Sequence, residues 1–170
     1  FEKWFKDSIA IDENGDPLVL YHGTTEPDIK QFKLSSSGAL GAGIYLTPIT
    51  DKANNYAGIP TPEAIDALEK SGHTSLSAPL REAQRTGEGI PQGNVIPTYA
   101  RIESPLIIKT EKNEYGYYED PMVNALVQLG VPKAKAENIV EKAYDTKGYI
   151  GKEVMSRAQN QGYDGIFQYR

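Results

Sequence analysis

A histidine follows directly on a short apolar run in the stretch LVLYHGTTEP. The run is rich in strand-forming residues and too short for a helix, which predicts a buried central strand over residues 18–22, ended by His22. Gly23 then lets a ligand approach the backbone, and Thr24 and Thr25 add hydroxyl groups. This combination is typical of a ligand-facing sheet edge. Taken alone, His22 is equally consistent with a structural histidine.

Two tyrosines lie eleven positions apart, Tyr45 in the stretch GIYL and Tyr56 in KANNYAG. The first stretch predicts a strand over residues 43–46 and the second a short helix, so the two rings could face each other across a slot that fits a flat ring. The alternative is that both rings belong to the core. The chain has 11 tyrosines, so composition does not choose between the two interpretations.

Other chemical signatures in the sequence are weaker. His73 lies in a glycine- and proline-rich region and is interpreted as a solvated loop residue. Two histidines and no cysteine make a poor zinc shell, so no metal site is predicted. Gly38, Gly41 and Gly43 precede a strand rather than a helix, unlike the dinucleotide fingerprint. The serines of LSSSG lack a GxSxG elbow and favour a solvated loop.

Composition sets broad limits on the class of protein. The 170 residues fit one domain over 1–170, and 39% hydrophobic with 24% charged residues is typical of a soluble globular protein. No apolar run reaches the roughly 20 residues of a membrane helix. The net charge of −5 and the lack of a Lys/Arg run give little support to a nonspecific phosphate-binding surface. A start at Phe1 without methionine indicates an excised piece of a longer chain.

The elements that must position these residues follow from periodicity, caps and turn residues. The predicted elements are a helix over about 1–8, a turn at ENGDP, a helix capped by Thr50 or Asp51 and stopped by Gly58, two strand segments in 96–109 hinged at ESP, helices in DPMVNALVQLG, KAKAENIVEKAY and IGKEVMSRAQNQG, and a strand in YDGIFQY. Residues 58–97 are interpreted as a variable helical insertion with two short helices, TPEAIDALEKSG and APLREAQRTG. Strands and helices in irregular order favour an α+β fold.

Three segments in this order, LVLYHGT, GAGIYLT and KANNYAG, resemble the ADP-ribosyltransferase superfamily, in the branch marked by a histidine, a tyrosine and a glutamate. More closely, WFKDSIAIDENGDPLVLYHGTT together with ARIESPLII and GYDGI is similar to the bacterial ADP-ribosyltransferase domains of polyvalent proteins in phages and conjugative elements and of toxin tips. The similarity spans nearly the whole chain apart from the insertion at about 60–95. It implies a split mixed sheet with flanking helices.

The resemblance also implies a reaction and a set of site residues. The activity would be that of an NAD-dependent mono-ADP-ribosyltransferase, which cleaves the nicotinamide glycosidic bond and transfers ADP-ribose to a macromolecular acceptor. The implied cofactor-binding residues are His22, Gly23, Thr24, Tyr45 and Tyr56. His22 would bind the adenine-side ribose, and the Gly23 backbone would hold the nicotinamide amide. Tyr45 and Tyr56 would sandwich the nicotinamide ring, a cation–π attraction of about 1 to 2 kcal/mol each.

The loop 33–43, with Lys33 and Ser37, would cover the NAD phosphates. The family's glutamate has no counterpart in this sequence. Glu153 lies on a predicted helix, Glu103 has the wrong strand order, and Gln168 comes too early and carries no charge. The catalytic role is therefore left empty.

Two interpretations of the missing glutamate remain open. We favour a truncated domain of an active transferase over a catalytically inert NAD-binding module, and a purely structural protein of a phage or conjugative element is a third interpretation. The acidic balance favours protein over nucleic acid as the acceptor. No membrane partner is predicted, and we expect action in the cytoplasm of the producing or target cell, as a toxin or effector of a mobile element.

Overall fold

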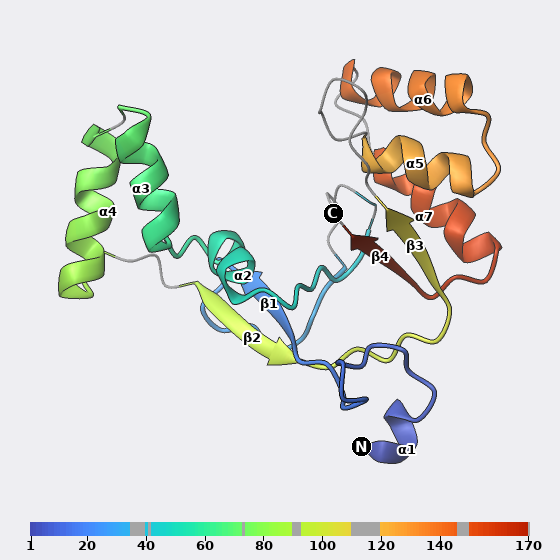
Figure 1. Ribbon diagram of the computed structural model, residues 1–170, viewed down its shortest axis with the longest axis horizontal. Helices are drawn as coiled ribbons and strands as arrows, with labels where there is room; N and C mark the ends of the chain where they lie inside the picture. The colour runs from blue at the N-terminus through green and yellow to red at the C-terminus, as the bar shows by residue number, and fades with distance from the viewer. Residues whose placement is uncertain are drawn as a thin grey trace. The chain divides into compact units, whose positions relative to one another are not determined.

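The computed structural model describes residues 1–34, 40, 42–72, 74–89, 93–109, 120–145 and 150–169. The chain forms two compact units. Unit 1 comprises Phe1–Ile11, Lys33–Ile44 and Ala100–Arg170, and unit 2 comprises Asp12–Phe32 and Tyr45–Tyr99. Figure 1 shows the elements along the chain. The mixture of helices and strands in irregular order is the predicted α+β class.

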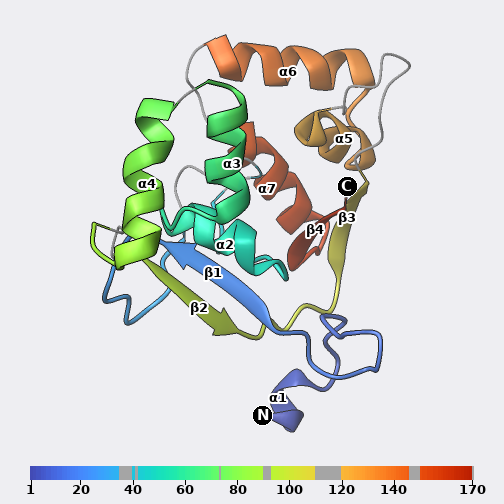
Figure 2. The same cartoon turned by 60° about the vertical axis from the view of Figure 1, so that its left-hand side comes forward.

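Unit 2 is built on β1 (Leu20–Thr24), which pairs antiparallel with β2 (Asn94–Thr98) (Figure 2). On the other edge of β1, the backbone N–H groups of Tyr21 and Thr47 each donate to the other residue's carbonyl oxygen, at 2.8 and 3.0 Å. β1 is thus flanked on both sides, as predicted for a central strand.

Two details of the predicted strands are wrong. β1 runs two residues past His22, because its ladder with β2 extends to Thr24, and only Leu20 of the strand is buried. Residues 43–46 form no regular strand, since the single bridge to β1 lies at Thr47. Apolar composition identified both segments as candidate strands. It does not show which backbone N–H and C=O groups find a hydrogen-bond partner.

The helix α2 (Thr50–Tyr56) follows, with Ala53 and the adjoining Ala57 fully buried. Its N-cap is Ile49 and no side chain caps it, so the predicted cap at Thr50 or Asp51 is wrong. The predicted stop is confirmed, because Gly58 adopts a φ of 71° that L side chains rarely take.

Two further helices, α3 (Pro62–Lys70) and α4 (Thr74–Thr86), fill most of the predicted insertion. The Thr61 hydroxyl accepts from the Ala64 N–H at 3.2 Å, which confirms the predicted cap. α4 begins four residues before the predicted Ala78, so Pro79 lies inside the helix, where it cannot donate a backbone hydrogen bond. The end of the predicted insertion contributes β2 to the sheet.

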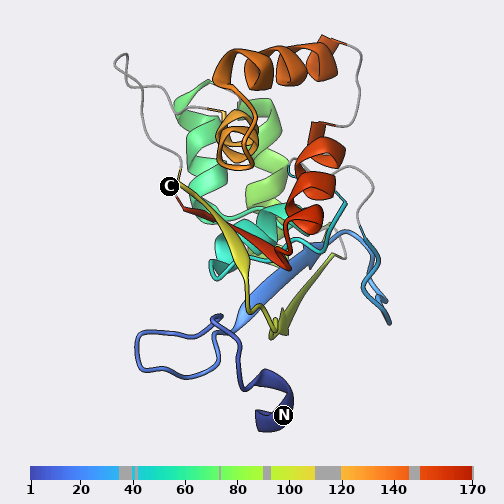
Figure 3. The same cartoon turned by 90° about the vertical axis from the view of Figure 1, so that its right-hand side faces the viewer.

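Unit 1 contains β3 (Pro105–Lys109) and β4 (Gly165–Tyr169), which pair in parallel (Figure 3). The helices α5 (Pro121–Gln128), α6 (Lys133–Asp145) and α7 (Ile150–Asn160) occur as predicted. The α5 cap is also confirmed, because the Asp120 carboxylate accepts from the Met122 N–H at 2.8 Å.

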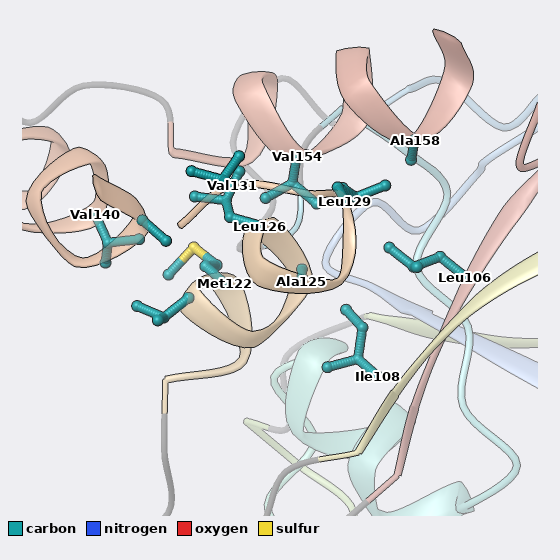
Figure 4. Close-up of a cluster of buried hydrophobic side chains, with 12 residues drawn as sticks. Leu106, Ile108, Met122, Ala125, Leu126, Leu129, Val131, Val140, Val154 and Ala158 are labelled. Carbon is teal, nitrogen blue, oxygen red and sulfur yellow. The ribbon is translucent and has the colours of Figure 1, made fainter. Parts of the chain in front are cut away.

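The core of unit 1 lies between these helices and β3. Figure 4 shows its buried side chains, which include Leu106, Ile108, Met122, Leu126, Val140 and Val154. Leu106 and Ile108 alternate with Ile107, which is 43% exposed, so one face of β3 meets the helices. Burial of this apolar set supplies the main stabilising term of the unit.

Polar contacts join the remaining parts of unit 1. α1 (Glu2–Phe5) is shorter than the predicted 1–8, and the buried Ser8 hydroxyl donates to the Ala100 carbonyl at 3.0 Å. The Asp164 carboxylate accepts from the backbone N–H groups of Glu103 and Ser104 at 2.8 and 2.9 Å. The aspartate of GYDGI therefore fixes the turn before β3. None of the helices in the described part of the chain is long and apolar enough to cross a membrane.

Candidate functional site

The half-buried His22 is held by a backbone carbonyl. Its Nδ1 lies 2.9 Å from the Tyr45 carbonyl oxygen. A carbonyl oxygen only accepts hydrogen bonds, so Nδ1 must carry the proton that joins the two atoms. In the neutral ring the other nitrogen, Nε2, is then an acceptor. This contact fixes the tautomer of His22 and gives the site one defined acceptor atom.

The ring of Phe32 packs against His22 in an edge arrangement, with the ring centroids 5.1 Å apart and the planes at 82°. Sequence reasoning missed Phe32, because it lies ten residues after His22 in a segment without periodicity. Only the path of the loop after β1 brings the two rings together.

Gly23 is required by a close approach of α2. A Cβ atom at this position would lie 1.9 Å from the Ala53 carbonyl oxygen and 2.9 Å from the Tyr56 Cβ. The same holds for Gly93, whose Cβ would lie 1.9 Å from the Ala57 carbonyl oxygen. From the sequence we expect Gly23 to let a ligand approach the backbone. The side-chain position of Gly23 is filled by the backbone of α2, so such an approach has to come from another side.

The backbone groups of Gly23 face a different direction. In an antiparallel strand the N–H and C=O of alternate residues point to the same edge. Tyr21 bonds to Thr47, and its β2 partner Pro97 has no N–H to offer, so the backbone groups of Tyr21 face away from β2. Those of Gly23 face the same way, and no residue in the described ranges pairs with them. The site therefore presents a donor and an acceptor next to His22.

The two predicted tyrosines both lie beside this edge. Tyr45 is half-buried and contributes the carbonyl that holds His22, while the Tyr56 Cβ adjoins Gly23. Tyr56 is 68% exposed, so the interpretation of this ring as part of the core is wrong. Thr24, half-buried at the end of β1, accepts from the Glu26 N–H at 3.1 Å through its hydroxyl. All five predicted site residues thus belong to unit 2.

The structure describes only some of the other candidate residues. Lys33 is exposed and belongs to unit 1, and Ser37 and His73 lie outside the described residues, as do Gly38, Gly41 and the serines of LSSSG. Glu153 lies on α7 and pairs with Arg157 at 2.8 Å, and Glu103 pairs with Arg101. Within the described residues no cluster of His, Asp or Glu side chains is arranged to hold a metal.

A family model described as ADP-ribosyltransferase in polyvalent proteins matches residues 12–170. The chain belongs to this family. The family of ADP-ribosyltransferases in polyvalent proteins is the one that the sequence motifs predicted, and the match includes both units except for α1 and its neighbours. No curated protein and no solved structure matches the chain significantly.

Proposed function

We propose that unit 2 binds NAD at the edge of β1 and that the protein transfers ADP-ribose from NAD to a macromolecular acceptor. Membership of the ADP-ribosyltransferase family supports the reaction class. The observation that carries the site is the hydrogen bond between His22 Nδ1 and the Tyr45 carbonyl. It leaves Nε2 as an acceptor near the backbone groups of Gly23, which pair with none of the residues that the structure describes. NAD offers matching ribose hydroxyls and a carboxamide.

Three parts of NAD have a complementary group in this proposal. A ribose hydroxyl donates to His22 Nε2. The carboxamide of nicotinamide, which has one carbonyl oxygen and one NH2 group, pairs with the N–H and C=O of Gly23 as a neighbouring strand would. The nicotinamide ring is cationic and stacks between Tyr45 and Tyr56, where each electron-rich face contributes about 1 to 2 kcal/mol once water is excluded.

In the proposed reaction, unit 2 holds the nicotinamide end of NAD in a fixed position. The bond between the nicotinamide nitrogen and ribose C1 breaks, and its electron pair neutralises the ring. Positive charge develops on the ribose, and an acceptor nucleophile then bonds to C1. Residues of unit 2 act by positioning, which lowers the entropic part of the barrier. The charge-stabilising role of the family's glutamate is assigned to no residue of this sequence.

The acceptor and the sheet are further parts of the proposal. The net charge of −5 favours a protein acceptor over a nucleic acid. The structure has two two-stranded sheets, the antiparallel pair β1–β2 and the parallel pair β3–β4. In this proposal they are the two parts of the split mixed sheet that the family resemblance implies.

Calorimetric titration with NAD tests this function. We expect saturable NAD binding by the wild-type chain. His22→Ala should bind NAD at least about tenfold more weakly, because it lacks the ring whose Nε2 would accept a hydrogen bond from the ribose hydroxyl. Lys33→Ala would show whether the 33–43 loop contributes. Wild-type protein that binds no NAD would refute the proposal. Binding without nicotinamide release would favour the inert NAD-binding module, consistent with the absent glutamate.

A further inference from the structure

The loop that follows β1 is attached at several points within unit 2. The Thr24 hydroxyl accepts from the Glu26 N–H, and the Asn94 side-chain amide donates to the Pro27 carbonyl. Asn94 is the β2 residue opposite Thr24, so this contact ties the loop to the sheet. The far end of the loop carries Phe32 back to the ring of His22. The loop is therefore positioned by β1, which carries His22, and by its partner strand β2.

The two contacts of His22 restrict different motions. A single hydrogen bond from Nδ1 to the Tyr45 carbonyl fixes one atom but leaves the imidazole able to tilt about that bond. The Phe32 ring, at 82° to the imidazole, blocks this tilt by packing against it. The terminal torsion of histidine has a broad minimum, so the packing contact is needed to select one ring plane.

We propose that Phe32 is a positioning residue that fixes the plane and tautomer of His22, so that Nε2 is presented to the ribose hydroxyl of NAD. The inference rests on the proposed NAD site. Phe32 touches His22 and not the reacting atoms. Without it, the imidazole leaves the Tyr45 carbonyl part of the time, the proton moves between the two nitrogens, and the fraction of protein ready to bind NAD falls.

The test combines NAD affinity with the state of the His22 ring. Phe32→Leu keeps apolar bulk but removes the aromatic contact, and Phe32→Tyr restores it. The control is Val127→Ala, which removes an exposed apolar side chain on α5 in unit 1. Calorimetry gives the NAD affinity, and long-range proton–nitrogen NMR reports the tautomer of His22. Since the chain has only two histidines, His73→Gln assigns the signals.

We expect Phe32→Leu to weaken NAD binding about three- to tenfold, the range of one edge-to-face aromatic contact. The His22 nitrogen shifts of Phe32→Leu should move from those of one tautomer toward an average of two, while Phe32→Tyr and Val127→Ala keep wild-type values. Wild-type affinity together with wild-type nitrogen shifts in Phe32→Leu would overturn the inference and leave the NAD proposal intact.

Two further outcomes are possible, no NAD binding by the wild type or no folding of Phe32→Leu. If the wild type binds no NAD, the proposed function fails, and the nitrogen shifts of the variants still decide whether Phe32 holds His22. If Phe32→Leu does not fold, cross-relaxation between the ring protons of His22 and Phe32 in the wild type decides. Its presence supports the positioning role, and its absence overturns it.

Discussion

At the residue scale, the site depends on what each group near β1 can donate or accept. The Tyr45 carbonyl forces the His22 proton onto Nδ1, and the alternation of β1 turns the backbone of Gly23 to the same edge as that of Tyr21. The types of these residues were readable from the sequence. Their pairing was not, because a hydrogen bond between residues 22 and 45 depends on tertiary structure.

Tyr56 offers the cleanest residue test, because its ring is 68% exposed. Tyr56→Ala should leave the melting temperature unchanged and weaken NAD binding about tenfold, the loss of one desolvated cation–π contact. Calorimetry and circular dichroism measure the two quantities. Tyr99→Ala, beyond the opposite end of the β1–β2 ladder, should change NAD affinity little. Equal affinities of wild type and Tyr56→Ala would exclude Tyr56 from the site.

Gly23 tests the close approach of α2 to β1. Gly23→Ala should lower the free energy of unfolding by about 3 kcal/mol or more, the upper end for overpacking, because backbone atoms of Ala53 must move. Gly93→Ala should behave alike. Gly15→Ala meets open space at a φ of 85° and should cost about 1 kcal/mol. Urea unfolding measures all three, and a Gly23→Ala variant of wild-type stability would contradict the packing.

At the element scale, helices with strong boundary residues were predictable and sheet partners were not. Thr61 and Asp120 cap their helices through local hydrogen bonds, which a short stretch of sequence specifies. The segment 43–46 has strand composition but lacks a ladder, and β1 ends at Thr24, opposite Asn94, where β2 begins. Such boundaries depend on a partner segment far along the chain, so composition could not place them.

The ion pairs between α3 and α4 give an element-scale prediction. Arg81 on α4 donates to Glu69 and Asp66 on α3, and its hydrogen bond lowers the pKa of the Glu69 carboxyl. A lowered pKa stabilises the folded pair at neutral pH, and this contribution is lost as the pH falls through the folded pKa. Because the groups are exposed, the effect is modest and screened by salt.

We therefore expect Arg81→Met to speed amide exchange in α3 and α4 relative to wild type at pH 6 and low salt. The difference in amide exchange between Arg81→Met and wild type should shrink below pH 3 and in 1 M salt, when both proteins are measured under the same conditions. The control is Arg85→Met, whose partner Glu82 lies on the same helix. It should have a smaller effect on α3. Equal exchange of wild type and Arg81→Met at pH 6 would show that the pair does not join the helices.

At the scale of the whole molecule, the chain crosses four times between the two units, and all five predicted NAD-binding residues belong to unit 2. The order of motifs was enough to predict the family, which the match over residues 12–170 confirms. The division into units was not predicted, because it depends on contacts between distant segments. The role of Phe32 was missed for the same reason, since its segment carries no motif.

The proposed NAD site is the edge of β1 in unit 2. An NMR titration with NAD tests it most directly by following the backbone amide of Gly23 and the ring of His22. We predict saturable shifts at both, at residues 45–47 and along α2, while amides of α5 and α6 in unit 1 stay in place. Unchanged Gly23 and His22 signals at millimolar NAD, or shifts confined to unit 1, would contradict the account.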